Sequence, residues 1–280
     1  MHGLPAFSPT SAAESRATGL AELHLLLSRD QGPQAWQQGL QEGLHAKLPF
    51  GVGVLDSHLP NGGLPCGALH EVVPATQAAL PAAFGFVIAV LARFSSMVPH
   101  AAKSRQIIFV LPGHGSRQCG RLSGHGLSRL GFDSSRAIVV EAANRQDNLW
   151  ALLEALRSGA PQAVAGMVDR LDLKTSQKLH LAAADCGLPL LLLRPAQTLE
   201  SSAATTRWRI GTAAAARDRF GTYARPRWHL QLERCRNGRP GEWVVEYDHV
   251  AHRFSLVAAL ADQTLSRSAS NQPRRQANRS

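Results

Sequence analysis

The stretch Gly51-Val-Gly-Val-Leu-Asp56, followed by Gly62-Gly-Leu-Pro-Cys-Gly-Ala-Leu-His-Glu-Val-Val73, decides the fold of this chain. Its glycine-rich turn leads into a short apolar strand, the usual approach to a phosphate-binding loop of the form Gly-x-x-x-x-Gly-Lys-Ser/Thr. Such a loop needs glycines to curl its N–H groups around phosphate, a lysine for the outer phosphates and a hydroxyl for Mg²⁺. The strand leads here into a segment that does not meet these requirements in order, namely Pro74, Ala75, Thr76, Gln77, Ala78, Ala79, Leu80 and Pro81.

The sequence therefore predicts a nucleotide-binding scaffold that has lost its nucleotide chemistry. We expect no bound cofactor, no resident metal and no enzymatic activity. An apolar run that ends in Asp169 resembles the metal-ordering strand of a working site. Without the lysine and the hydroxyl, loop hydrogen bonding is the favoured role for this carboxylate.

From Leu69 onward, short apolar runs alternate with helical patterns, which indicates a parallel sheet buried on both faces. The predicted strands are 69–73, 106–111, 136–141, 163–168 and 189–193. The predicted helices between them are 81–96, 120–130, 146–158 and 174–186.

After Pro195 the helical patterns stop, and four further strands are predicted at 208–213, 227–235, 243–248 and 253–257. Asn237-Gly238 and Pro240-Gly241 mark a hairpin turn between two of them. The predicted fold class is α/β, with a mostly parallel central sheet flanked by helices and an antiparallel C-terminal extension.

Three regions are predicted along the chain. Residues 1–50 hold an amphipathic helix at Glu14–Asp30 and a linker, and residues 51–262 form the core, with its antiparallel hairpin at about 207–257. Residues 263–280 are a basic tail of Ser, Gln, Asn, Arg and Pro, which we expect to be disordered.

The basic character of the chain belongs to its C-terminal quarter. The net charge is +10, and residues 207–280 carry 14 arginines, no lysine and six acidic residues. Arginine and tryptophan are enriched at interface hot spots, and clustered arginine favours phosphate or carboxylate partners. The predicted partner or DNA contacts, taken to be exposed, are Arg207, Arg209, Arg234, Arg236, Trp228, Trp243, Arg274 and Arg275. The alternative is that the tryptophans fill the core while the arginines stay hydrated.

The location of the protein is expected to be cytoplasmic. The longest apolar run, Leu80 to Ala92, is too short to span a bilayer, and no secretion signal begins the sequence. Four widely separated cysteines form neither a zinc motif nor a disulfide framework.

Seven blocks of sequence, taken together, resemble the bacterial ImuA family. They are 51–56, 62–71, Asn148-Leu-Trp-Ala-Leu-Leu-Glu154, 171–184, Gly187-Leu-Pro-Leu-Leu-Leu-Leu-Arg-Pro195, Ala203-Ala-Thr-Thr-Arg-Trp-Arg209 and 227–243. The resemblance runs from about residue 14 to 262. It implies a RecA-like fold, distantly similar to the SulA division inhibitors.

Members of that family are encoded in DNA-damage-inducible mutagenesis cassettes. The resemblance implies a non-catalytic accessory role in translesion synthesis, beside an inactive Y-family polymerase homologue (ImuB) and an error-prone polymerase. RecA and DNA are further candidate partners, and no membrane is implied.

Two other functions remain open on the sequence. A SulA-like protein would block polymerisation of the division GTPase on the same degenerate scaffold. A divergent DNA-dependent ATPase would need a lysine from elsewhere, for which Lys103 is the nearest candidate. The loop Ala196 to Thr206 has no basic residue and carries Glu200, which does not favour RecA-type strand binding.

Overall fold

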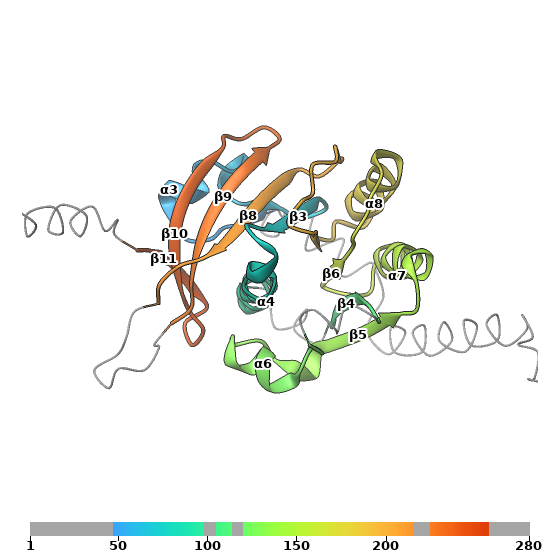
Figure 1. Cartoon of the computed structure of the whole chain (residues 1–280), viewed down its shortest axis with the longest axis horizontal. Coiled ribbons are helices and arrows are strands. Elements are labelled where there is room, and N and C mark those ends of the chain that lie inside the picture. Colours follow the sequence, from blue (N-terminus) through green and yellow to red (C-terminus); the bar gives the residue numbers. More distant parts are fainter. Residues whose placement is uncertain (1–46, 98–104, 114–119, 216–224, 258–280) are drawn as a thin grey trace, which may run out of the picture.

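The computed structural model describes residues 47–97, 105–113, 120–215 and 225–257 (Figure 1). Outside the described residues lie the predicted helix at Glu14–Asp30, Lys103, and the basic tail with Arg274 and Arg275. The helix predicted at 120–130 begins at Gly124.

A single nine-stranded sheet organises the described chain, in the order β11-β10-β9-β8-β3-β7-β6-β4-β5. Its parallel part comprises β3 (Leu69–Pro74), β4 (Ile107–Pro112), β5 (Ala137–Ala142), β6 (Ala163–Met167), β7 (Leu190–Leu193) and β8 (Thr206–Thr212). The strand that precedes the degenerate loop, β3, is central and pairs in parallel with both β7 and β8. Every residue of β3 is buried, as expected for a strand covered on both faces.

The antiparallel extension adds β9 (Arg227–Cys235), β10 (Gly241–Asp248) and β11 (Arg253–Leu256) to β8. The α/β class and the antiparallel C-terminal extension are thus confirmed. The bounds of β9 match the predicted ones, and those of the other strands differ by one or two residues.

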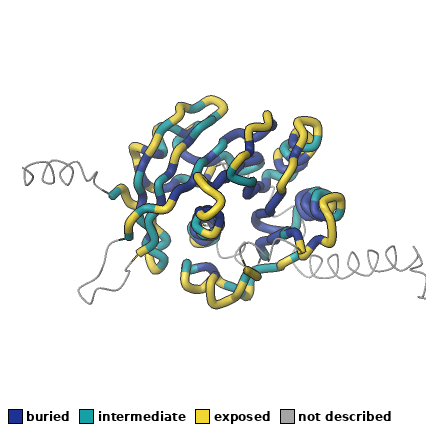
Figure 2. Tube along the Cα trace, in the orientation of Figure 1, coloured by how far each residue is buried: buried dark blue, intermediate teal, exposed yellow. Residues whose placement is uncertain are grey.

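Helix α4 (Leu80–Met97) packs on one face of the sheet against β3, β7 and β8. The other face is covered by α7 (Arg145–Arg157), against β4, β5 and β6, and by α8 (Leu173–Cys186), which packs on α7 and β3. The short α6 (Gly124–Arg129) lies near the end of α4 in Figure 1. The buried positions follow the sheet and the inner sides of these helices (Figure 2).

Helix α4 with its preceding turn, Gln77–Met97, is long and apolar enough to cross a membrane by length and composition. However, 61% of its most apolar window is buried inside the molecule. A helix that is apolar all round and packs on a sheet is a core helix. Its hydrophobicity is explained by that packing.

Aromatic rings fill the space between α4 and the antiparallel strands. Trp208 lies 6.3 Å from Phe86 and 5.4 Å from Phe50 between ring centroids, and Trp228 lies 5.9 Å from Phe86. The indole N–H of Trp228 donates to the carbonyl of Ala82 at 2.9 Å. These rings join the antiparallel extension to the parallel sheet in one core.

Residues 47–65 are an irregular segment that the sequence does not predict in detail. It contains β1 (Lys47–Leu48) paired with β2 (Leu64–Pro65), the single-turn α3 (Gly53–Asp56) and the 3₁₀ turn η1 (Pro60–Gly62). The carboxylate of Asp56 accepts from the N–H groups of Phe50, Gly51 and Val52 at 2.7, 2.8 and 3.1 Å. These three hydrogen bonds close the block 51–56 into a turn and explain why it ends in an aspartate.

The turn that leads into β3 depends on one glycine. Gly67 has a φ of +64°, and a Cβ atom there would lie 3.2 Å from the Cα of Gly187, which ends α8. A left-handed residue in close backbone contact favours glycine. The Gly-Leu-Pro-x-Gly turn therefore fixes β3 against the end of α8.

Candidate functional site

The degenerate loop crosses directly from β3 to α4. The N–H of Ala75 donates to the carbonyl of Ile210 at 2.7 Å, so the loop begins by extending the pairing of β3 with β8. A 3₁₀ turn, η2 (Gln77–Ala79), then joins α4. Pro81, in the first turn of α4, has no N–H to offer at a helix N-terminus, where phosphate groups usually bind.

A cleft of about 510 Å³ opens beside this loop, at the carboxyl ends of three parallel strands. Ligand sites of open α/β sheets form at this edge. The lining residues are Gln77, Leu80, Met167, Asp169, Arg194 and Pro195. Among the described residues no group of three or more His, Cys, Asp or Glu side chains has metal-binding geometry.

Arg194 and Glu71 form a buried ion pair beneath the cleft. Both side chains are fully enclosed, and Nε of Arg194 lies 3.5 Å from Oε1 of Glu71. The guanidinium also donates to the carbonyl of Val168 at 3.1 Å and contacts the Glu200 carboxylate at 2.5 Å. Its charge is therefore neutralised inside the protein.

Arg207 approaches the same carboxylate from the neighbouring strand. It is directly opposite Glu71 in the pairing of β3 with β8, and both its Nε and Nη2 lie 2.8 Å from Oε2. Ser202 donates its hydroxyl to the same oxygen at 2.9 Å. Glu71 thus pairs with two arginines and accepts from one hydroxyl.

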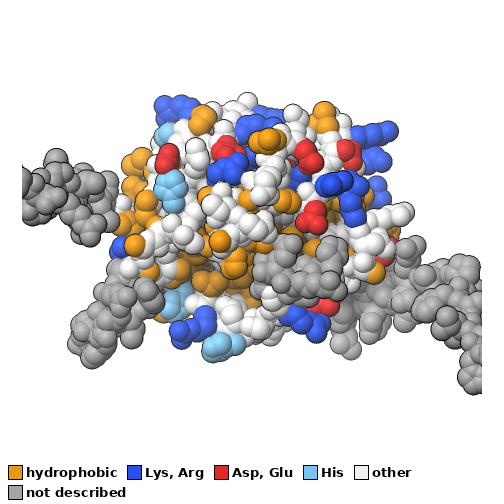
Figure 3. All heavy atoms as spheres, viewed as in Figure 1, with side chains coloured by type: hydrophobic (Ala, Val, Ile, Leu, Met, Phe, Trp, Pro, Cys, Tyr) orange, Lys and Arg blue, Asp and Glu red, His pale blue; other side chains and the backbone are white. Residues whose placement is uncertain are grey.

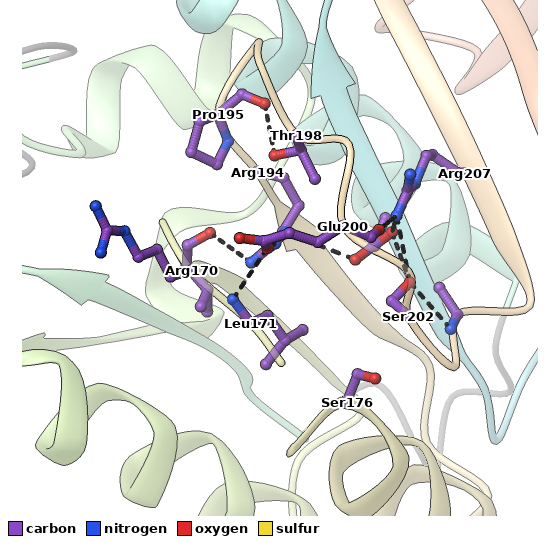
Figure 4. Close-up of polar contacts among 12 residues, drawn as sticks. Arg170, Leu171, Ser176, Arg194, Pro195, Thr198, Glu200, Ser202 and Arg207 are labelled. Carbon is purple, nitrogen blue, oxygen red and sulfur yellow. Dashed lines mark hydrogen bonds and ion pairs between the residues drawn. The ribbon is translucent and has the colours of Figure 1, made fainter. Parts of the chain in front are cut away.

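The chain between β7 and β8 is held down by this ion cluster. Glu200 extends between Arg194 and Arg207, and Arg207 donates to its carbonyl at 2.6 Å (Figure 4). Arg234 donates to the carbonyls of Ser202 and Ala204, each at 2.7 Å. Residues 196–205 are consequently an irregular but firmly bonded loop.

Electrostatic repulsion accompanies these bonds. Burial, and next the charge of Arg207, lower the pKa of Arg234, which lies opposite Arg207 in the pairing of β8 with β9. Glu71 acts in the reverse direction, favouring the charged guanidinium. The buried carboxylate of Glu71 therefore pairs directly with Arg194 and Arg207, and it favours the charged form of the neighbouring Arg234.

The predicted contact residues that the structure describes fall into three groups. Trp228 and Trp243 are buried in the aromatic core, as the alternative interpretation of the tryptophans expects. Arg207, Arg209 and Arg234 are bonded within the protein, Arg209 to Glu233 and the others as described above. Arg236 is exposed. The expectation of exposure therefore holds for Arg236, while a contact role for these residues stays a prediction.

Several basic side chains of the sheet face around these arginines pair with acidic ones. Along β9 and β10, Arg227 pairs with Glu246 at 2.7 Å and His229 lies 2.6 Å from Glu242. Arg225 lies 2.6 Å from Asp248. On the side of the molecule shown in Figure 3, basic and acidic side chains are interspersed. The described residues 207–215 and 225–257 nevertheless carry eight arginines against four acidic residues, so part of the excess positive charge lies here.

The sequence did not single out Glu71 or Arg194, although both lie inside blocks that carry the family resemblance. A signal was present in each case. Glu71 is a carboxylate inside the strand that the sequence predicts to be buried on both faces, and Arg194 follows a run of four leucines. Charged side chains in such positions are almost always paired. This rule would have predicted that Glu71 and Arg194 have charged partners, but not which partners or at what distances.

Comparison with known proteins supports the resemblance. The chain is 33% identical over 234 residues to Protein ImuA of Caulobacter vibrioides strain NA1000 / CB15N, covering 77% of this chain and 90% of that protein. Protein ImuA of strain ATCC 19089 / CIP 103742 / CB 15 matches to the same extent. The chain belongs to the ImuA family. No family model matches the sequence. Membership in the ImuA family connects the chain with the induced-mutagenesis cassette that the sequence resemblance implied.

Proposed function

We propose that this ImuA-family protein is a non-catalytic, cytoplasmic adaptor for DNA-damage-induced translesion synthesis. Its partners would be an inactive Y-family polymerase homologue of the ImuB type and an error-prone polymerase. Family membership supports the pathway. The observation that carries the non-catalytic role is the degenerate loop, which continues the β-sheet pairing where a nucleotide scaffold would bind phosphate.

The cationic group nearest the cleft does not replace a phosphate-binding lysine. Arg194 is fully buried, and its guanidinium contacts the carbonyl of Val168 and the carboxylates of Glu71 and Glu200. To bind an incoming phosphate, it would have to give up a charged partner inside the protein. Breaking a buried ion pair costs about 3–5 kcal/mol, which is unfavourable for a nucleotide site.

Calorimetry with Mg-ATP tests the non-catalytic role directly. We expect no measurable heat of binding at micromolar nucleotide, because the loop has no glycine nest and no lysine. Saturable binding with a micromolar dissociation constant would contradict the proposal and favour the divergent ATPase.

The adaptor role requires a second experiment, since a protein that does not bind ATP can have other functions. The tagged full chain should be recovered from DNA-damaged cells and its co-purifying proteins identified. We expect the polymerase homologue and the error-prone polymerase. Recovery of the division GTPase without either polymerase would support the SulA-like alternative instead.

A further inference from the structure

Strand β5 forms one outer edge of the nine-stranded sheet (Figure 1). It pairs in parallel with β4 over six residues, from Ala137 opposite Ile107 to Ala142 opposite Pro112. In the part of the chain that the structure describes, no strand pairs with its other side. Its sequence, Ala-Ile-Val-Val-Glu-Ala, is rich in β-branched residues.

Natural proteins usually protect such an edge with lysine, proline, a bulge or a very short strand. The opposite edge of the sheet, β11, is only four residues long and begins with Arg253. Strand β5 has neither lysine nor proline, and its charged residue, Glu141, pairs with Arg121 of the same chain at 2.9 Å. Val139 is 41% exposed. Among the described residues, the edge at β5 is therefore open to strand addition.

The direction of the backbone groups identifies the residues at the open edge. In a parallel strand, the N–H and C=O of one residue face one neighbour and those of the next residue face the other side. The carbonyl of Ala142 accepts from the N–H of Gly113, at the end of β4, at 2.8 Å. Ile138 and Val140 therefore face β4, whereas Val139 and Glu141 direct their backbone groups away from it.

Strand β5 is self-complementary about Val139. If a second copy adds antiparallel with Val139 opposite Val139, then Ile138 lies opposite Val140 and Ala137 lies opposite Glu141. Cross-strand pairs of β-branched residues stabilise a sheet, and like charges placed opposite each other destabilise it. In this register no acidic side chain faces another. We propose that β5 is a homodimer interface, through which a second copy extends the sheet about a two-fold axis at Val139.

Replacing Val139 by proline tests this interface, because it removes an outward N–H and leaves the bonds to β4 in place. Proline is tolerated on an edge strand when its N–H would face solvent. By sedimentation of the full chain, we expect a dimer for the wild type and for Val139→Thr, which keeps the N–H and the branched side chain. In Val139→Pro the dimer should weaken by at least about tenfold. A monomeric wild type, or an unchanged dimer in the proline variant, would overturn the proposal.

Two further variants keep the test decisive if the proline variant does not fold. Val139→Lys would place two like charges opposite each other at the two-fold axis, so the dimer should again weaken at least about tenfold. Val139→Cys should form an intermolecular disulfide under mild oxidation, because directly opposite Cα atoms lie about 5.5 Å apart. Val54→Cys, exposed on α3, is the matched control and should not cross-link. An unaffected dimer in the lysine variant, or no more cross-linking in Val139→Cys than in that control, would count against this register.

Discussion

At the scale of single residues, the buried carboxylate of Glu71 determines how the cleft and the following loop are built. It pairs with Arg194 below the cleft and with Arg207 beside the loop, so both charges depend on it. A buried ion pair gives little net stability, but losing one partner leaves the other charge without compensation. Glu71 is thus a structural residue in the strand that leads into the degenerate loop.

Replacing Glu71 by alanine should lower the free energy of unfolding by about 3–5 kcal/mol, because two enclosed arginines lose the buried carboxylate that they share. Urea denaturation measures this loss. Glu141→Ala is a suitable control, since its pair with Arg121 is exposed and contributes at most about 1 kcal/mol. If the two variants were equally stable, the cluster around Glu71 would not be stabilising the fold.

His70 should make stability depend on pH. Burial lowers the pKa of His70 to about 4, although the hydrogen bond of its ring to the Pro65 carbonyl acts in the reverse direction. Because the pKa of the unfolded chain is higher, at about 6.5, the unfolded state binds more protons between these values. The free energy of unfolding should therefore rise with pH across this window, by about 3 kcal/mol in all.

Denaturation curves of wild type and His70→Gln at several pH values check this expectation. The variant removes the titrating group, so the stability difference between wild type and variant should shrink as the pH falls from 6.5 to 4. The exposed His125 provides the control, because the free energy of unfolding of His125→Gln should change with pH in the same way as that of the wild type. A constant difference between wild type and His70→Gln would contradict the role of His70.

At the scale of elements, hydrophobic periodicity predicted the sheet and its helices well. Every predicted strand from Leu69 to Val257 was found, because buried strands need continuous apolar runs and these are visible in one sequence. The sequence did not predict the individual elements of the segment 47–65, because its shape depends on the Asp56 hydrogen bonds and on packing against the hairpin. The order of the strands also depends on contacts distant in sequence.

The candidate site was predictable in part for the same physical reason. The loss of the phosphate-binding loop is a local feature and was evident from Pro74 to Pro81. The internal bonding of Arg207 and Arg234 was not, because Arg207 bonds Glu71, more than a hundred residues earlier in the chain, and Arg234 bonds the carbonyls of Ser202 and Ala204 in the preceding loop. Arginine content alone does not distinguish a charge that stabilises a loop from one that faces a partner.

Strand β9 and the turn after it therefore contain two arginines that should respond differently to replacement. Arg234→Ala leaves the carbonyls of Ser202 and Ala204 without their donor and should cost about 1.5–3 kcal/mol of unfolding free energy. Arg236→Ala removes an exposed side chain and should stay within about 0.5 kcal/mol of wild type. Thermal or urea denaturation of each single variant distinguishes them, and equal losses would contradict the structural role of Arg234. Partner binding is then best tested with Arg236→Ala, which should remain well folded.

At the scale of the whole molecule, the distribution of charge limits where DNA could bind. On the described antiparallel face, Arg209 and Arg227 pair with acidic residues, whereas residues 263–280 contain four arginines and no acidic residue. Non-specific DNA binding depends on unpaired positive charge and weakens as salt is added. Any direct affinity of this protein for DNA should therefore reside mainly in that terminal segment.

A variant truncated after Leu265, compared with the full-length chain, tests whether the terminal segment carries the affinity for DNA. The last described strand, β11, ends at Leu256, and the segment removed contains no apolar residue except alanine and proline. It has little to bury, so the melting temperature should change by no more than about 2 °C, since a loss of 1 kcal/mol would shift it by about that amount or more. Affinity for duplex DNA at low salt should fall markedly, together with the slope of its salt dependence. A melting temperature lowered by many degrees would show that the tail packs on the core, and unchanged DNA affinity would place the contact on the exposed arginines of the hairpin, with Arg236 first among them.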